Sequence, residues 1–221
     1  MLLLINKPKG ITSHNVVDTV RRITGLRKVG HAGTLDPNAT GLLIVGVGKE
    51  STRKLGDISK NTRKEYLAKI CLGENRDTDD SEGEIISNFI LNEEPSEQRV
   101  KKVLLSFKGE IDQIPPIFSA IKSRGKTAYK EARKGRNVIL QSRKVYVFLI
   151  KLINYSYPEV DLLFMVSSGT YIRALARDIG VKLGTGGYLK ELKRTKIGIY
   201  SIDQAVKLDE LTSENWQRHS L

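Results

Sequence analysis

The start of the chain carries two hydrophobic periods, first that of a strand and then that of a helix. The apolar run at residues 2–5 predicts a first strand, which the turn at residues 7–10 ends. Thr12 and Ser13 then offer an N-cap, and Gly25 ends the helix that follows. The apolar residues of this helix recur at helical spacing: Val16, Val17, Val20 and Ile23.

Two different strand patterns follow, separated by a short helix expected at residues 51–58. Residues 42–47 are almost all apolar, which predicts a buried strand. Residues 64–73 alternate, so the faces of this second strand differ: Tyr66, Ala68 and Ile70 share one, and Leu67, Lys69 and Cys71 the other. A tyrosine on such a strand most often belongs to the core. If its face borders a site, the ring can instead stack on a planar ligand such as a base.

The second half of the chain continues to mix helices and strands. The expected elements are, in order, a helix capped by Ser96 and ended by Gly109, a hairpin of strands at 145–155 and 162–166, a helix from about 171 ended by Gly180, a strand at 188–200 and a closing helix at 208–216. No tandem repeat, low-complexity segment or linker interrupts this order.

The glycine-rich stretch at residues 30–41 breaks the regular pattern and predicts a tight loop leading into the strand at 42–47. Pro37 biases Asp36 away from the helical region, so this carboxylate is expected in the loop, on a rigid platform. An isolated Asp-Pro is ordinarily a turn that caps a backbone amide. Here His31 lies five residues earlier and the glycines permit close approach, so a functional site is also consistent.

Three basic residues are candidates for a site that includes Asp36. Lys7 and Lys9 lie beside the Asp36 region only if the first strand pairs with the strand after Gly41; otherwise they belong to a solvated turn. Arg173 lies at the N-terminal end of its expected helix, where the helix dipole disfavours a cation. An arginine can hold a carboxylate bidentately, and Asp36 is one partner open to it.

Charge narrows the class of partner. The formal net charge is +12 and the pI about 9.7, which favours a polyanion, nucleic acid before a membrane surface. Residues 119–144 hold nine basic residues and one acid, so a phosphate-contacting arm is expected there. The lone Cys71 excludes an intramolecular disulfide and suits a reducing cytoplasm. No signal peptide and no run of about 20 apolar residues is recognisable, so no membrane association is expected.

An acidic loop at residues 77–84 invites a metal-site reading. An EF-hand loop that starts at Asp77 would need an oxygen ligand and then glycine at positions five and six, but Ser81 and Glu82 stand there. The loop therefore predicts a solvated turn, in which one carboxylate could orient a basic residue of a site.

Six blocks, taken together and in order, resemble the TruB-type tRNA pseudouridine synthases. They are Lys7-Pro8-Lys9-Gly10-Ile11-Thr12-Ser13, the loop at 30–41, Lys64-Glu65-Tyr66, Gln113-Ile114-Pro115-Pro116 with Ser119-Ala120-Ile121-Lys122, Gly169-Thr170-Tyr171-Ile172-Arg173, and Leu192-Lys193-Arg194-Thr195. The resemblance implies an α+β pseudouridine synthase fold, with a mixed, largely antiparallel central sheet flanked by helices and a basic inserted arm at about 113–144. It implies one catalytic domain over residues 1–221. Members commonly carry a C-terminal PUA-type RNA-binding domain, which is not expected here, whether the chain is naturally short or cut.

The resemblance also implies a reaction: isomerisation of uridine to pseudouridine at position 55 in the T-loop of tRNA, without metal or organic cofactor. The target base must be flipped out of the folded loop before any atom can be reached. The implied catalytic residues are Asp36, Tyr171 as a base near the ribose, and Arg173 as partner of the aspartate. The implied substrate-binding residues are Tyr66 stacking on the uracil, Leu192 lining its pocket, His31 filling the vacated RNA loop, and Lys7, Lys9, Ser119, Lys122 and Tyr171.

The partner implied is the T-arm of tRNA, bound by a cytoplasmic monomer without an obligate protein partner. Two alternatives remain open. One is a non-catalytic RNA-binding or RNA-folding protein on the same scaffold, which needs Asp36 only as a turn residue. The other is a sister synthase that acts on guide-directed or ribosomal uridines.

Overall fold

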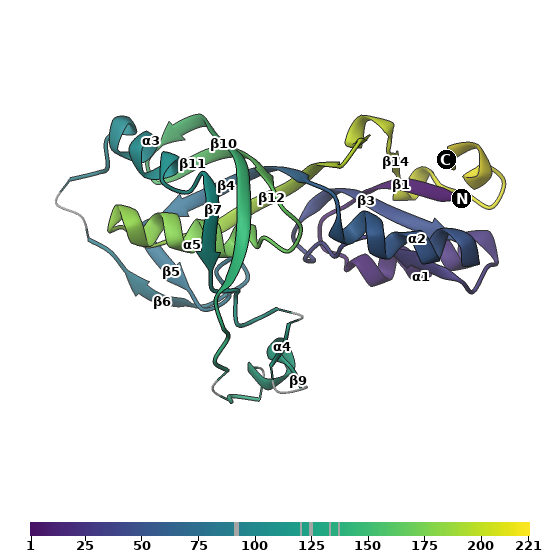
Figure 1. Ribbon diagram of the computed structural model, residues 1–221, viewed down its shortest axis with the longest axis horizontal. Coiled ribbons are helices and arrows are strands. Elements are labelled where there is room, and N and C mark those ends of the chain that lie inside the picture. The colour runs from purple at the N-terminus through teal and green to yellow at the C-terminus, as the bar shows by residue number, and fades with distance from the viewer. Residues whose placement is uncertain (91–92, 120, 124–125, 133, 137) are drawn as a thin grey trace. The chain divides into compact units, whose positions relative to one another are not determined.

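The computed structural model describes residues 1–90, 93–119, 121–123, 126–132, 134–136 and 138–221 (Figure 1). The chain divides into two compact units, the first comprising residues 1–67 and 192–221 and the second residues 68–191. Strands β4 (Lys64–Leu72) and β12 (Gly187–Ile197) each begin in one unit and end in the other. No helix among the described residues has the length and apolarity that a membrane span requires.

The first unit is built on a mixed sheet. Strand β1 (Leu2–Lys7) pairs antiparallel with β3 (Thr40–Val47), placing Lys7 opposite Gly41, and parallel with the short β14 (Val206–Lys207). Strand β3 also pairs antiparallel with β2 (Val29–His31) and parallel with β12, while β13 (Tyr200–Ser201) pairs with the end of β12. The first strand thus lies beside the strand that follows the Asp36 loop, which was the condition for Lys7 and Lys9 to be near that loop.

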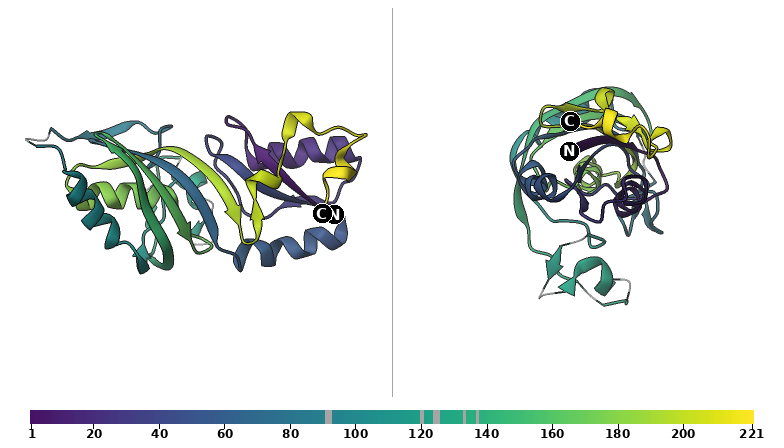
Figure 2. Two further views of the ribbon diagram at one scale, coloured as in Figure 1. Left: turned by 90° about the horizontal axis from the view of Figure 1, so that it is seen from above. Right: turned by 90° about the vertical axis from the view of Figure 1, so that its right-hand side faces the viewer.

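Two helices cover opposite faces of this sheet (Figure 2, left). Helix α1 (Ser13–Thr24) packs Val16, Val17 and Val20 on the face that carries Leu3, Ile5, Leu43 and Val45. Helix α2 (Lys49–Lys60) packs Leu55 on the other face, against Leu4, Leu42 and Ile44. Alternation along β1 and β3 therefore gives each helix its own apolar surface.

The limits of α1 are those the sequence predicts. Thr12 is the N-cap and forms a capping box with Asn15, and Gly25 caps the C-terminus in the left-handed conformation at φ 69°.

In the second unit, β10 (Arg143–Ser156) pairs antiparallel with β11 (Glu159–Val166) on one side and with β7 (Gly109–Gln113) on the other, and β11 is next to β4 in the sheet. Strands β10 and β11 form the predicted hairpin, which turns at residues 157–158 (Figure 1). Helix α3 (Glu97–Leu105), capped by Ser96, contacts β10 and α5 (Ile172–Leu183). The smaller elements are the ribbon of β5 (Glu74–Arg76) and β6 (Ile85–Asn88), the hairpin of β8 (Lys122–Ser123) and β9 (Lys126–Thr127), and helix α4 (Ala128–Ala132).

Helix α5 does not end at Gly180, so that boundary was wrong. The helix continues to Leu183 and is capped by Gly184 at φ 78°. Gly180 serves close packing instead, because a Cβ there would lie 2.3 Å from the carbonyl carbon of Gly186. The glycine lets the turn after the helix pass against the helix backbone.

The closing helix expected at 208–216 is also wrong. The segment forms two short 3₁₀ turns, Leu208–Glu210 and Trp216–His219. The side chain of Asn215 accepts a bond from the Thr212 amide at 2.8 Å and donates one to the Glu210 carbonyl at 2.9 Å. Such side-chain bonds to the backbone compete with helical ones. Trp216 is nevertheless buried, in the cluster that includes α1.

Candidate active-site loop and its surroundings

The loop that carries Asp36 joins β2 to β3 in the first unit and is anchored along its length. The amide of Ala39 donates to the Asp36 carbonyl at 3.1 Å, which closes a turn around Pro37. The amide of Gly10 donates to the Pro37 carbonyl at 2.9 Å, so the turn after β1 holds this loop. Asp36 itself is half-buried. Its carboxylate thus belongs to a short segment with little freedom to move.

Ser13 holds the residue that precedes Asp36. Its hydroxyl donates to the Leu35 carbonyl at 3.0 Å and accepts from the Leu35 amide at 2.8 Å. Both residues are buried, so these bonds exclude water. Because Ser13 is the first residue of α1, the helix and the loop are fixed to each other.

Arg194 of β12 fixes the other side of the loop. This arginine is 1% exposed, and its guanidinium donates to the carbonyls of Leu42 at 2.8 Å, Gly33 at 3.0 Å and Thr34 at 3.4 Å. Gly41 lets the backbone of β3 lie close to the backbone of Arg194, because a Cβ at Gly41 would lie 2.3 Å from the Arg194 carbonyl oxygen. The parallel pairing of β3 with β12 therefore depends on a glycine at the end of the loop.

Two buried lysines add positive charge to the same unit. Lys7 donates to the carbonyls of Pro8 at 2.8 Å, Ile11 at 2.7 Å and Pro37 at 3.1 Å. Lys64 of β4 donates to the carbonyl of Thr62 at 2.8 Å and to that of Ser59.

Burial lowers the pKa of both lysines. For Lys7 the pKa falls to about 8; Asp36 opposes this fall and Arg194 adds to it. For Lys64 burial and the charge of Arg194 lower the pKa to about 8. The opposing effect of Asp36 shows that its carboxylate lies within electrostatic reach of the Lys7 ammonium. Lys7 and Arg194 thus bind backbone carbonyls of the loop that carries Asp36, whereas Lys64 binds carbonyls at the end of α2 and in the turn after it.

The other predicted residues of the first unit lie on three strands and in one turn. Tyr66 is on the buried face of β4, and the alternation predicted for that strand is confirmed. His31 ends β2, where burial and the charge of Arg194 lower its pKa. Leu192 is half-buried, and its carbonyl accepts from the Thr40 hydroxyl at 3.4 Å. Lys9 is exposed in the turn after β1.

In the second unit, Tyr171 is the N-cap residue of α5 and is held by an amide side chain. Gln113 of β7 is fully buried; it accepts from the Tyr171 amide at 2.9 Å and donates to the Tyr171 carbonyl at 3.1 Å. The Arg143 guanidinium lies 4.9 Å from the centre of the Tyr171 ring, close enough for a cation–π contact. The tyrosine backbone and ring are thus both positioned.

Arg173 is buried in the second unit and binds the acidic loop. Its guanidinium donates to the Thr78 carbonyl at 3.0 Å and the Phe118 carbonyl at 3.1 Å, and lies 3.4 Å from the Asp80 carboxylate. Asp80 is thus a carboxylate of this loop that pairs with a basic residue, while the role of Arg173 in a site stays a prediction. The predicted pairing of Arg173 with Asp36 stays a prediction.

The same loop is less solvated than expected. Asp79 is buried, adopts φ 60° and pairs with Arg177 at 2.8 Å, one helical turn beyond Arg173. Burial raises the pKa of Asp79 to about 6, although the arginines oppose this shift. Arg177 also donates to the Ile114 carbonyl at 2.8 Å, so α5 is tied both to the acidic loop and to the segment after β7.

The expected arm is described only in part. Ser119 is buried, and its carbonyl accepts from the Tyr129 amide at 3.1 Å. The side chain of Lys122 lies outside the described residues, as do those of Arg124 and Lys126. Lys134 and Arg136 are exposed in the turn after α4, and Arg136 pairs with Glu131 at 2.6 Å.

Comparisons with known proteins identify the family. Residues 21–172 match the N-terminal domain model of the TruB family pseudouridylate synthases, and residues 173–220 match the C-terminal domain model of tRNA pseudouridylate synthase B. The chain is 46% identical to tRNA pseudouridine synthase B of Thermobifida fusca (strain YX) over 96% of this chain and 74% of the relative. It is 44% identical to the protein of that name from Aquifex aeolicus (strain VF5), over 99% of this chain and 76% of the relative.

Solved structures agree on the fold. A chain from a Cbf5-Nop10-Gar1 complex superposes with a TM-score of 0.75 at 28% identity, covering 100% of this chain and 56% of that one. A chain from an H/ACA RNP bound to a substrate RNA containing 2′-deoxyuridine gives 0.70 at 27% identity, covering 100% and 55%. The expected α+β fold is confirmed. The chain belongs to the TruB family of pseudouridylate synthases, and it isomerises uridine to pseudouridine in tRNA.

Proposed function

We propose that the uridine modified is that at position 55 in the T-loop of tRNA and that Asp36 is the carboxylate on which the reaction depends. The observation that carries the proposal is the Asp36 loop. It is bound through Leu35 to Ser13, through Pro37 to Gly10 and Lys7, and through Gly33 and Thr34 to Arg194. A loop held by so many hydrogen bonds suits a catalytic group that must contact one atom of a substrate in a fixed geometry.

The chemistry accounts for the kind of residue required. Isomerisation breaks the bond between C1′ and N1, turns the detached uracil and forms a bond between C1′ and C5. The proton that leaves C5 is balanced by the one gained at N1. A carboxylate can form a covalent intermediate at C1′ or C6, or take up a proton, and each of these routes needs it ionised. The Lys7 ammonium lies within electrostatic reach of this carboxylate.

The remaining roles follow from the family motifs. We assign Tyr66 to stacking on the flipped uracil, Leu192 to the apolar wall, Tyr171 to the ribose, and Arg173 to the Asp36 carboxylate. Stacking of a base on an aromatic ring contributes about 1–3 kcal/mol, which offsets the few kcal/mol that flipping costs. His31 takes the place left by the base in the RNA loop; its lowered pKa keeps the imidazole neutral there.

The basic arm is proposed to contact the phosphates of the T-arm, with Lys7, Lys9, Ser119 and Lys122 completing the RNA surface. The described part of the arm exposes Lys130, Lys134 and Arg136. One catalytic domain, acting as a monomer in the cytoplasm without a bound cofactor, completes the proposal.

The position can be tested with transcripts. The wild-type chain is incubated with a tRNA transcript and with a matched transcript that carries cytidine at position 55, and modified positions are mapped. The proposal expects one pseudouridine, at position 55, and none in the cytidine transcript. Pseudouridine at another position in both transcripts would refute the assignment.

A further inference from the structure

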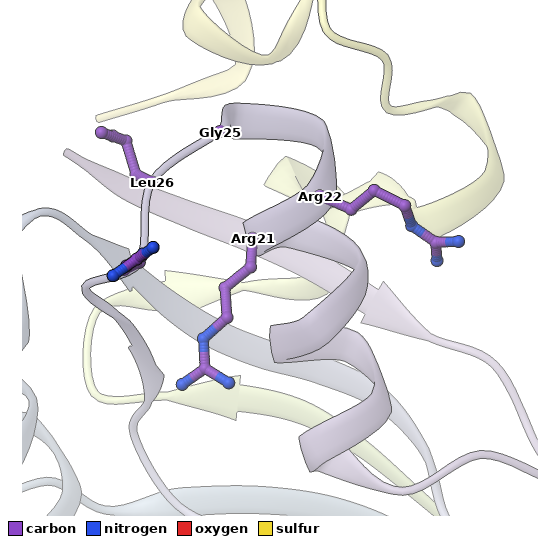
Figure 3. Close-up of a pocket in the computed structure, with 5 residues that line it drawn as sticks. Arg21, Arg22, Gly25 and Leu26 are labelled. Atoms are coloured by element: carbon purple, nitrogen blue, oxygen red, sulfur yellow. The ribbon is translucent and has the colours of Figure 1, made fainter.

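A hollow at the C-terminal end of α1 carries positive charge that the proposed site does not use. Figure 3 shows Arg21 and Arg22 leaving the last turn of the helix and Leu26 in the loop after Gly25. The residues that line the hollow are Arg21, Arg22, Gly25, Leu26 and Arg27. The exposed Lys28 follows directly, and no acidic residue occurs between positions 21 and 28.

One arginine of the hollow is held by the protein and two remain available. Arg21 pairs with Asp18 at 2.8 Å and donates to the Val29 carbonyl at 3.1 Å. Arg22 is exposed and donates to the Thr19 hydroxyl at 3.4 Å. Arg27 is exposed, and within the described part of the chain neither it nor Arg22 forms an ion pair. Two guanidiniums on one hollow can therefore meet an external anion without first breaking a salt bridge.

The helix dipole explains only part of this charge. Cations in the last turn of a helix are stabilised by the partial negative charge there, which accounts for Arg21 and Arg22. Arg27 and Lys28 come after the Gly25 cap, in a loop, so the helix dipole does not account for these two cations. Their presence beside the first pair concentrates the charge at one place.

The hollow also has an apolar component. Leu26 is 44% exposed between the arginines, and arginine stems supply further apolar surface. A guanidinium binds phosphate oxygens through two parallel hydrogen bonds. The combination of a cationic rim with exposed hydrocarbon fits the alternating phosphate and sugar of a nucleic-acid backbone. An isolated carboxylate side chain would bind the guanidinium groups but would leave the apolar surface without a partner.

Helix α1 sets the place of the hollow along the RNA. The helix begins at Ser13, which holds the residue before Asp36, and its 12 residues span about 18 Å at 1.5 Å per residue. We propose that this hollow binds the sugar-phosphate backbone of the substrate tRNA, about 18 Å from the nucleotide at the Asp36 loop. The proposal deepens the proposed function and rests on it for the identity of the RNA.

The test measures binding of an unmodified tRNA transcript to the full chain between 50 and 200 mM KCl. Over this range the affinity of a protein that makes 6–10 phosphate contacts falls by roughly 10³–10⁵. The variants are R22Q/R27Q, which removes two charges from the hollow, and R22K/R27K, which keeps them. The matched control is R53Q/K54Q, which removes two exposed charges from α2. Circular dichroism verifies that each variant is folded.

We expect R22Q/R27Q to bind tRNA on the order of 10-fold more weakly and to lower the slope of log K against log salt by about 2. R22K/R27K should keep most of the slope, and R53Q/K54Q should match wild type. Equal behaviour of R22Q/R27Q and R53Q/K54Q would overturn the proposal. Binding to polyglutamate is measured in parallel. If R22Q/R27Q binds polyglutamate more weakly than wild type but binds tRNA equally well, the proposal is also overturned, because the hollow would then suit an acidic protein. The outcome is independent of catalysis: a wild-type chain that binds tRNA through the hollow but forms no pseudouridine would overturn only the proposed function.

Discussion

Ser13 offers a test of the loop that changes a single atom. Replacing it with alanine removes the hydroxyl that accepts from the Leu35 amide at 2.8 Å and donates to the Leu35 carbonyl at 3.0 Å. Ser13 is 2% exposed and Leu35 3%, so water does not readily replace either bond. Two lost hydrogen bonds and two buried polar groups without partners cost roughly 2–4 kcal/mol in total.

Function should suffer as well as stability. Asp36 follows Leu35 directly, so loosening this anchor displaces the carboxylate. A displacement of about 1 Å can cost on the order of 100-fold in rate. We therefore expect S13A to lower kcat by about 10- to 100-fold, with a smaller effect on KM for tRNA.

The assay pairs kinetics with hydrogen exchange. The Leu35 amide of S13A should exchange at least about 10-fold faster than in wild type, since each 1.4 kcal/mol of lost local stability is a factor of ten. The matched control is S106A, which loses one exposed hydroxyl bond, from Ser106 to the Val103 carbonyl at 2.7 Å. Wild-type exchange at Leu35 together with wild-type kcat in S13A would refute the inference that this anchor positions Asp36.

Two further predictions concern the second unit. Burial raises the pKa of Asp79 from 3.8 to about 6, so between these values the folded chain binds the proton and the unfolded chain does not. The contribution of Asp79 to stability therefore falls as pH rises from about 4 to 6, by about 3 kcal/mol. D79N, whose asparagine tolerates φ 60°, should lose that pH dependence in urea titrations; an unchanged profile would contradict it. G180A should destabilise by about 1–3 kcal/mol because its Cβ would meet the backbone of Gly186, whereas G56A, in open space on α2, should stabilise by up to about 1 kcal/mol in the same thermal scans. Equal shifts in the two glycine variants would contradict that reading of Gly180.

Short sequence patterns were sufficient to predict much of the fold. The capping box at Thr12 and the left-handed Gly25 fix α1 because both act within a few residues. The period of two along β4 likewise places Tyr66 and Lys69 on opposite faces without tertiary information. Glycine was harder to interpret, since a helix stop and a close approach of two backbones require the same residue. At Gly180 the second reason applied, and it depends on the path of residues 185–187, which no local pattern reveals.

The site divides in the same way. Asp36 could be placed in a rigid loop because glycine and proline restrict the backbone locally. The burial of Lys7 and Arg194 could not be predicted, because lysine and arginine are ordinarily exposed and here are compensated by carbonyls far away in sequence. Gln113 belongs to one of the six blocks, but its role could not be predicted for a similar reason, because that role depends on Tyr171, 58 residues later.

The central claim is that the Asp36 carboxylate is chemically required, and D36N tests it most directly. Asparagine keeps the size of the side chain and removes its charge, so the loop and its anchors should stay in place. Tritium release from tRNA labelled at C5 of uridine measures the reaction, because re-attachment at C5 displaces that hydrogen. The account predicts that D36N releases no tritium above background while binding tRNA as tightly as wild type. Wild-type release by a folded D36N would contradict it.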